Sequence, residues 1–78
     1  MGKFYTANEE LSAYLTEELG LTFHDREEPE LKYFTAESGK QVKLDIKNNI
    51  VTLLDDKGLY VDEASSYTDG QLVRFLED

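Results

Sequence analysis

Residues 31–62 read LKYFTAESGKQVKLDIKNNIVTLLDDKGLYVD, and this stretch decides the fold. Apolar and polar residues alternate through it with a period of two, which is typical of β-strands that bury one face. Turn sequences interrupt the alternation at Ser38-Gly39, at Asn48-Asn49 and at residues 55–58, Asp-Asp-Lys-Gly. Glycine, asparagine and aspartate favour tight turns because they tolerate or stabilise the turn backbone. The stretch therefore predicts a four-stranded antiparallel meander.

Short loops fix an expected register for these strands. A two-residue loop at Ser38-Gly39 places Tyr33 opposite Leu44, and one at Asn48-Asn49 places Leu44 opposite Leu53. A loop over residues 56–58 places Leu53 opposite Val61. This register predicts one buried sheet face, made of Leu31, Tyr33, Val42, Leu44, Ile46, Val51, Leu53, Leu59 and Val61. The outer face is then expected to carry Phe34, Lys43, Ile50, Leu54 and Tyr60.

Amphipathic patterns on both sides of the strands predict two helices. The first, over about residues 7–19, is expected to begin at a capping box formed by residues 6–9, Thr-Ala-Asn-Glu, and to end before Gly20. Its apolar stripe is Leu11, Leu15 and Leu19. The second, over about residues 68–77, is expected to begin at the capping box Thr68-Asp69-Gly70-Gln71, with the stripe Leu72, Phe75 and Leu76.

A chain of 78 residues has room for one domain. The predicted elements are a helix, a four-stranded meander and a second helix. The helices and the sheet can form two layers that bury their apolar faces against each other. We therefore expect a single small acidic α+β domain over residues 1–78. In this two-layer sandwich both helices cover the same sheet face.

Charge and cysteine content narrow the classes of function. The chain has 17 Asp and Glu against 8 Lys and Arg, so its net charge is −9. Phosphate binding needs clustered cations, so we expect no direct binding of nucleic acid, and the same repulsion disfavours an anionic membrane surface. The absence of cysteine excludes disulfides, thiolate catalysis, zinc ribbons and iron–sulfur clusters.

The beginning of the chain turns polar within a few residues. No apolar run is long enough for a signal peptide or a membrane span. The expected location is the cytoplasm, without membrane association.

Candidate catalytic and metal-binding residues are few. His24-Asp25 is the one neighbouring histidine–carboxylate pair, and no serine or cysteine pattern accompanies it as a nucleophile. Asp55-Asp56 and Asp62-Glu63 offer oxygen ligands, but their spacing fits no calcium-binding loop. The sequence therefore predicts no catalytic residue, no cofactor and no metal site, and hence no enzyme.

An unusual placement of carboxylates suggests a binding surface instead. Glu17 and Glu18 lie in the last turn of the first predicted helix, where the helix dipole disfavours negative charge. More acids follow, and we expect one acidic patch around this end of the helix, next to apolar residues of the outer sheet face. The candidate partner-binding residues are Glu17, Glu18, Asp25, Glu27, Glu28, Glu30, Phe34, Leu54 and Tyr60.

These features favour a small, non-catalytic module that binds a protein with a basic surface. A narrower version is an inhibitor that presents carboxylates where a nucleic-acid-binding partner expects phosphates, as acidic mimics among phage and mobile-element proteins do. The alternative is a structural or assembly subunit that homodimerises through the outer sheet face. An enzyme or a metal-binding protein is a more distant alternative.

Overall fold

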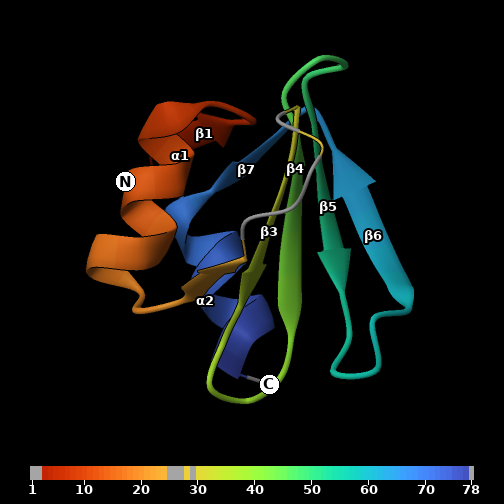
Figure 1. Cartoon of the computed structure of the whole chain (residues 1–78). Coiled ribbons are helices and arrows are strands. Elements are labelled where there is room, and N and C mark those ends of the chain that lie inside the picture. The colour runs from red at the N-terminus through yellow and green to blue at the C-terminus, as the bar shows by residue number, and fades with distance from the viewer. Residues whose placement is uncertain (1–2, 25–27, 29, 78) are drawn as a thin grey trace.

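Figure 1 shows the computed structural model of the chain, which describes residues 3–24, 28 and 30–77. The elements in chain order are β1 (Phe4–Thr6), α1 (Glu9–Ala13), η1 (Tyr14–Glu18), β2 (Thr22–His24), β3 (Leu31–Thr35), β4 (Gln41–Asp45), β5 (Ile50–Leu54), β6 (Tyr60–Ala64), β7 (Ser66–Thr68) and α2 (Asp69–Glu77). The segment η1 is a π-helical continuation of α1. The predicted α+β class is therefore confirmed.

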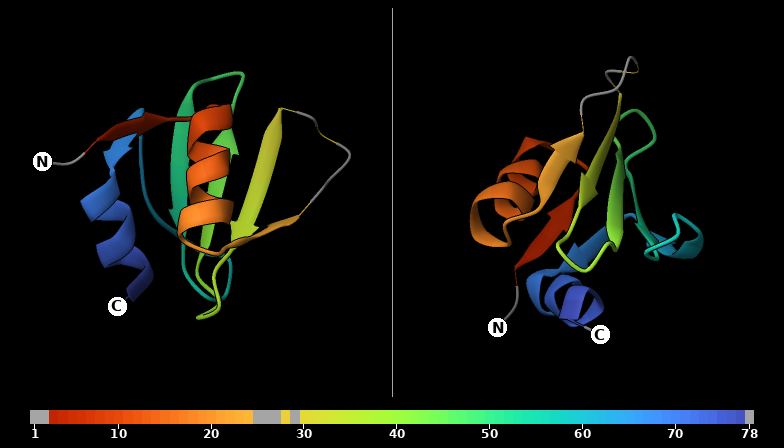
Figure 2. Two further views of the ribbon diagram at one scale, coloured as in Figure 1. Left: turned by 90° about the vertical axis from the view of Figure 1, so that its left-hand side faces the viewer. Right: turned by 60° about the horizontal axis from the view of Figure 1, so that its bottom comes forward.

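The strands form two antiparallel sheets rather than one. The larger sheet has five strands in the order β2-β3-β4-β5-β6, and the smaller sheet pairs β1 with β7. The prediction of four strands missed β1, β2 and β7, which have three residues each and are too short for a period of two to stand out. Figure 2 shows α1 lying across one face of the larger sheet, with α2 beside it.

One apolar cluster fills the space between the larger sheet and the helices. The sheet contributes Phe34, Val42, Leu44, Val51 and Leu53, and the remaining members are Tyr5, Ala7, Leu11, Leu15, Leu21, Tyr67 and Leu72. Full burial of one large apolar side chain stabilises a fold by about 1.5–3 kcal/mol. Burial of this cluster therefore contributes strongly to the stability of the fold.

The register of β3 differs from the prediction by one residue. Phe34 pairs with Val42, and Tyr33 pairs with Lys43. Phe34 is 0% exposed in the core, whereas Tyr33 is half-buried among the outer-face residues. Because a one-residue slip exchanges the two faces of a strand, the predicted burial of Tyr33 and Leu31 and the outer-face position of Phe34 were wrong.

The cause of this slip is the turn between β3 and β4. The Ala36 amide donates to the Lys40 carbonyl at 2.8 Å, which leaves residues 37–39 as a three-residue loop instead of the expected two. Gly39 adopts a φ of 97°, the left-handed conformation that such loops place on glycine. A Cβ at Gly39 would also lie 3.1 Å from the Cβ of Asp56, so the two hairpin turns meet at this glycine.

The turn between β4 and β5 is longer than expected, but the sheet faces are preserved. Leu44 pairs with Val51 instead of Leu53, because the loop comprises residues 46–49 rather than two residues. Asn49 adopts a φ of 57° within it, as the sequence pattern predicted for an asparagine turn. A shift of two residues leaves every side chain on its original face, so Leu44, Val51 and Leu53 are buried as predicted.

The turn between β5 and β6 is the predicted type, with a glycine bulge. The Asp55 amide donates to the Leu59 carbonyl at 2.9 Å, and the Gly58 amide donates to the Asp55 carbonyl at 3.0 Å. Gly58 has a φ of 80°. Leu59, however, is 61% exposed, so its predicted burial was wrong.

A β-bulge follows in β6 and changes the expected pairing beyond the turn. Leu54 pairs with Tyr60 as predicted, but Leu53 pairs with Asp62, which leaves Val61 as an extra residue. A bulge places two residues opposite one and bends the strand. Val61 is 48% exposed as a result, and the prediction that it faces the core was wrong.

The first helix begins two residues later than its predicted cap. Asn8 is the N-cap, because its side-chain oxygen accepts a hydrogen bond from the Leu11 amide at 3.1 Å. Thr6 cannot serve as the cap because it belongs to β1 and pairs with Ser66. The predicted capping box at residues 6–9 was therefore wrong, and the extended conformation of β1 explains why.

The second helix has the capping box that the sequence predicted. The Thr68 amide donates to the Gln71 side-chain oxygen at 2.8 Å, and the Gln71 amide donates to the Thr68 hydroxyl at 3.1 Å. This reciprocal pair satisfies two backbone donors at the start of α2. The bounds of α2 agree with the predicted helix to within one residue.

The register of β3 can be tested by a pair of substitutions in neighbouring residues. Phe34→Ala should reduce the free energy of unfolding by about 3–5 kcal/mol, because it removes a fully buried ring. Tyr33→Ala should cost only about 1 kcal/mol, since Tyr33 is half-buried outside the core. Urea denaturation followed by circular dichroism measures both values. A larger loss for Tyr33→Ala than for Phe34→Ala would contradict the register described here.

Candidate functional site: an acidic groove beside the second helix

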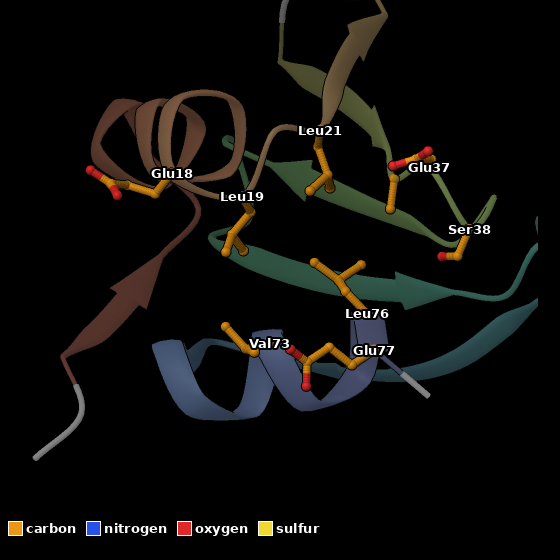
Figure 3. Close-up of a pocket in the computed structure, with 9 residues that line it drawn as sticks. Glu18, Leu19, Leu21, Glu37, Ser38, Val73, Leu76 and Glu77 are labelled. Carbon is orange, nitrogen blue, oxygen red and sulfur yellow. The ribbon is translucent and has the colours of Figure 1, made fainter.

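An open groove of about 500 Å³ lies where η1, the β3–β4 turn and α2 meet. We call it the acidic groove, and its lining residues are Glu18, Leu19, Leu21, Ala36, Glu37, Ser38, Val73, Leu76 and Glu77. Figure 3 shows the apolar side chains of Leu19, Leu21 and Leu76 converging on its centre. The groove therefore has an apolar floor.

The end of the first helix supplies one wall of the groove. The Leu19 amide donates to the Tyr14 carbonyl at 3.1 Å, five residues back, which is the π-helical pattern. Because a π-turn holds more residues than an α-turn, the stripe of Leu11 and Leu15 does not continue to Leu19 as an α-helix would place it. Leu19 is half-buried and lines the groove instead of joining the core.

Gly20 and Leu21 then reverse the chain, as the sequence predicted. Gly20 has a φ of 71°, and the Leu21 amide donates to the Leu15 carbonyl at 2.9 Å. This bond satisfies a carbonyl at the end of the helix. Leu21 is 5% exposed and joins the core cluster, so it fixes the wall of the groove against the sheet.

Lys40 attaches the second helix to the β3–β4 turn. Its ammonium group donates to the Phe75 carbonyl at 2.8 Å and lies 5.2 Å from the centroid of the Phe75 ring. A cation at this end of a helix also complements the negative end of the helix dipole. The contact holds α2 beside the turn, so that residues from both elements line the groove.

The lining of the acidic groove is anionic. Among the residues that the structure describes, the lining contains three glutamates and no lysine, arginine or histidine. Glu18, Glu37 and Glu77 are all exposed. Figure 3 shows the Glu18 carboxylate pointing away from the centre, while Glu37 and Glu77 lie on opposite sides of the leucine side chains. The groove is therefore suited to an occupant that combines an apolar group with positive charge.

A second hollow of about 410 Å³ continues along α2 and shares Val73 and Glu77 with the acidic groove. Tyr14 lines it and stacks on Tyr5 with ring centroids 4.5 Å apart. Burial is the main cause that raises the pKa of Tyr14, so its hydroxyl is protonated at neutral pH and can donate a hydrogen bond. Arg74 is the cation in this lining.

The described members of the predicted acidic patch come from two segments of the chain. Glu17 and Glu18 are exposed at the end of η1, as expected. Glu28 and Glu30 are also exposed, but they precede β3, and the Glu30 carbonyl accepts a hydrogen bond from the Ile46 amide. Asp25 and Glu27 lie outside the described residues.

Strand β2 separates the two groups of acids. It runs antiparallel to β3, with Thr22 opposite Thr35 and His24 opposite Tyr33. The chain therefore travels from the turn end of β3 to its other end between Glu18 and Glu30. The four residue-to-residue steps from Thr35 to Leu31 along β3 span about 13 Å. Glu17 and Glu18 therefore lie near one end of β3 and Glu30 near the other, and a shared acidic patch stays a prediction.

Of the three apolar candidates, Leu54 and Tyr60 are neighbours, whereas Phe34 lies on the opposite face of the sheet. Phe34 is fully buried and faces the helices, so it offers no surface to a partner. Leu54 and Tyr60 pair with each other across β5 and β6 on the outer face. Leu54 is half-buried, and Tyr60 is 61% exposed.

The candidate residues named from the sequence include neither Glu37 nor Glu77. The same signal that singled out Glu17 and Glu18 applies to Glu77, because each opposes a helix dipole. No comparable signal marks Glu37, which joins the groove through the position of the turn against α2.

One member of each acidic pair at the third hairpin, Asp55 and Asp62, accepts hydrogen bonds from within the chain. Asp55 accepts hydrogen bonds from the amides of Lys57 and Leu59 at 2.8 and 2.9 Å. In the part of the chain that the structure describes, no three His, Asp or Glu side chains gather as metal ligands. Within the same residues, no helix has the length and apolar character needed to cross a bilayer.

No family model, no curated protein and no solved structure is significantly similar to this chain.

Asp55 should make the fold sensitive to acid. Hydrogen bonds from the Leu59 and Lys57 amides lower the pKa of Asp55 below its ordinary value. A lowered pKa in the folded state means that the stabilisation is present above the unfolded pKa of about 4 and is lost as pH falls through the folded value. Asp55→Asn should therefore weaken the dependence of the urea midpoint on pH below pH 4. Asp56→Asn keeps the Asp55 bonds and is the control; an equal effect of both variants would contradict this role.

Proposed function

We propose that this protein is a small, non-catalytic module that binds a protein partner with a basic surface, through the acidic groove. The observation that carries the proposal is an apolar floor flanked by the exposed Glu37 and Glu77, with no cation among the described residues of the lining. In protein interfaces a few apolar anchors supply most of the affinity, while charges guide association and exclude wrong partners. An apolar side chain of the partner would pack on the floor of the groove, and a lysine or arginine next to it would lie near the glutamates.

The charge of the whole chain supports the same kind of partner. A net charge of −9 produces a field that attracts cations and repels nucleic acid and anionic membranes. Glu9 and Glu10 at the start of α1 already pair with Lys32 and Lys3, at 3.1 and 2.8 Å. The groove glutamates Glu37 and Glu77 are exposed to an incoming partner.

An inhibitor that competes with nucleic acid for a basic protein is a narrower form of this proposal. Carboxylates would then stand in for phosphates on the partner's surface. The apolar floor of the groove would add contacts that a phosphate backbone does not offer, so such an inhibitor would retain part of its affinity at high salt.

Charge reversal tests the groove directly. An amphipathic helical peptide of lysine and leucine, with leucines spaced for one helix face, serves as the probe. Its binding should shift the amide NMR signals of Val73 and Leu76 in α2. The double variant Glu37→Lys/Glu77→Lys should lower the affinity by about tenfold and flatten its salt dependence, because two favourable charge contacts become repulsive.

Glu17→Lys is the charge-matched control for the single variants Glu37→Lys and Glu77→Lys, because Glu17 is exposed on η1 and does not line the groove. It changes the net charge in the same direction and should lower the affinity by no more than about twofold. Equal losses for Glu17→Lys and for each groove variant would mean that only the overall charge matters. Thermal unfolding of each variant establishes that the fold is retained.

A further inference from the structure

Strand β6 lies at one edge of the larger sheet and is paired on one side only among the described residues. Figure 1 shows β6 at the end of the sheet, beyond β5, on the side away from α1. An edge strand presents backbone donors and acceptors in a row, which makes it a template for another strand. None of the residues that line the acidic groove belongs to β6.

The direction of the backbone groups follows from the turn that precedes β6. The Asp55 amide donates to the Leu59 carbonyl at 2.9 Å, so these two residues form a hydrogen-bonded pair. Hydrogen-bonded and non-hydrogen-bonded pairs alternate in antiparallel sheets. The next pair, Leu54 and Tyr60, is therefore non-hydrogen-bonded, and the Tyr60 N–H and C=O point to the free edge.

This edge also carries a run of exposed apolar residues. Leu59, Tyr60 and Val61 are 61%, 61% and 48% exposed, and they are consecutive in the chain. Proteins commonly protect edge strands with lysine or proline, and residues 59–64 contain neither. The bulge at Val61 and two exposed acids, Asp62 and Glu63, are the protection that β6 has.

The two acids decide which strand this edge can accept. A second copy of the chain pairing antiparallel through β6 would bring Asp62 and Glu63 close to the same residues of its partner, which is unfavourable across strands. The net charge of −9 adds a general repulsion between copies. A strand that carries lysine or arginine would instead meet opposite charges.

We propose that the free edge of β6 binds an extended, basic segment of another protein by strand addition. The backbone of Tyr60 supplies hydrogen bonds to the segment, and apolar side chains of the segment pack on Tyr60 and Val61. Lysine or arginine side chains of the segment lie near Asp62 and Glu63. The inference rests on the proposed basic partner, but it assigns that partner a surface separate from the acidic groove.

The probe for this test is a nine-residue peptide of alternating lysine and valine, compared with the same peptide carrying glutamate in place of lysine. The readout is hydrogen exchange of the Tyr60 amide, which the free edge leaves unprotected. The lysine peptide at saturation should slow this exchange by about tenfold or more, because the amide gains a hydrogen bond. The glutamate peptide should leave the exchange unchanged.

Two variants make the test specific. Val61→Lys and Glu63→Lys both place a lysine at exposed positions of β6, and each should lower the affinity for the lysine peptide by about fivefold. Asp62 is not reversed, because its carboxylate accepts a hydrogen bond from the buried Tyr67 hydroxyl at 3.1 Å. Asp62→Asn keeps an acceptor there and should reduce the affinity less than Glu63→Lys does.

Three results would overturn the inference. The first is an unchanged Tyr60 exchange with the lysine peptide, and the second is equal protection by the glutamate peptide. The third is protection that rises with protein concentration in the absence of peptide, together with the mass of a dimer, which would assign the edge to a second copy.

The Glu37→Lys/Glu77→Lys variant separates this inference from the proposed groove. It should keep the protection of the Tyr60 amide by the lysine peptide. If the double variant loses helical-peptide binding but keeps Tyr60 protection, both proposals are supported. If the unaltered chain binds no helical peptide but its Tyr60 amide is protected by the lysine peptide, only the proposed groove is overturned.

Discussion

The three-residue turn between β3 and β4 sets the constraint on which the rest of the structure depends. Its length decides which face of β3 meets the helices, and Gly39 makes that length possible because it adopts a left-handed conformation. With this turn Phe34 enters the core, where it is completely buried. The other members of the buried sheet face then pack around Phe34, and the helices pack on that face.

The same register explains how the first helix is held. Lys32 shares a face with the core residue Phe34 two positions along the strand, so its ammonium group must reach water past the helix. It does so by pairing with Glu9 at 3.1 Å at the start of α1, while it lies 5.6 Å from the centroid of the Phe23 ring. The Lys32 ammonium group, which the predicted register would place on the outer face, instead connects β3 to α1 through its ion pair with Glu9.

Residues of the β3–β4 turn contribute both to contacts that hold the fold together and to the candidate site. Gly39 meets Asp56 of the neighbouring hairpin, and Lys40 binds the Phe75 carbonyl near the end of α2. Glu37 and Ser38 from the same turn line the acidic groove. Because the turn is fixed from both sides, the groove has a defined wall before any partner arrives, which reduces the entropy lost on binding.

The partners proposed for the acidic groove and for the edge of β6 share a positive charge but differ in shape. The proposed groove partner inserts a side chain between two helical segments and a turn, whereas the proposed edge partner adds an extended backbone. In both places carboxylates stand beside exposed or half-buried apolar atoms, such as Glu77 beside Leu76 and Glu63 near Val61. Under both proposals, a negatively charged rim around apolar contacts would favour a basic partner over an acidic one.

Local chemistry in the sequence determined the α+β class, the position of the second helix and the positions of the turns. The Thr68–Gln71 capping box and the turn ending at Gly58 formed as expected, because each depends on interactions within a few residues. Their geometry is complete before distant parts of the chain meet. The sequence also showed that carboxylates near the helix ends are out of place, which pointed toward Glu18.

Tertiary structure alone decided the register of β3, the bulge at Val61, the short strands β1, β2 and β7, and the lining of the groove. A two-residue and a three-residue loop at Ser38-Gly39 both satisfy the local pattern, since both Tyr33 and Phe34 can fill a core. The choice between them depends on the fit of Phe34 beneath the helices and of Gly39 against Asp56, which are contacts between segments distant in sequence. Such contacts leave no periodic signal, so no pattern in the chain could have placed Glu37 and Glu77 around the same groove.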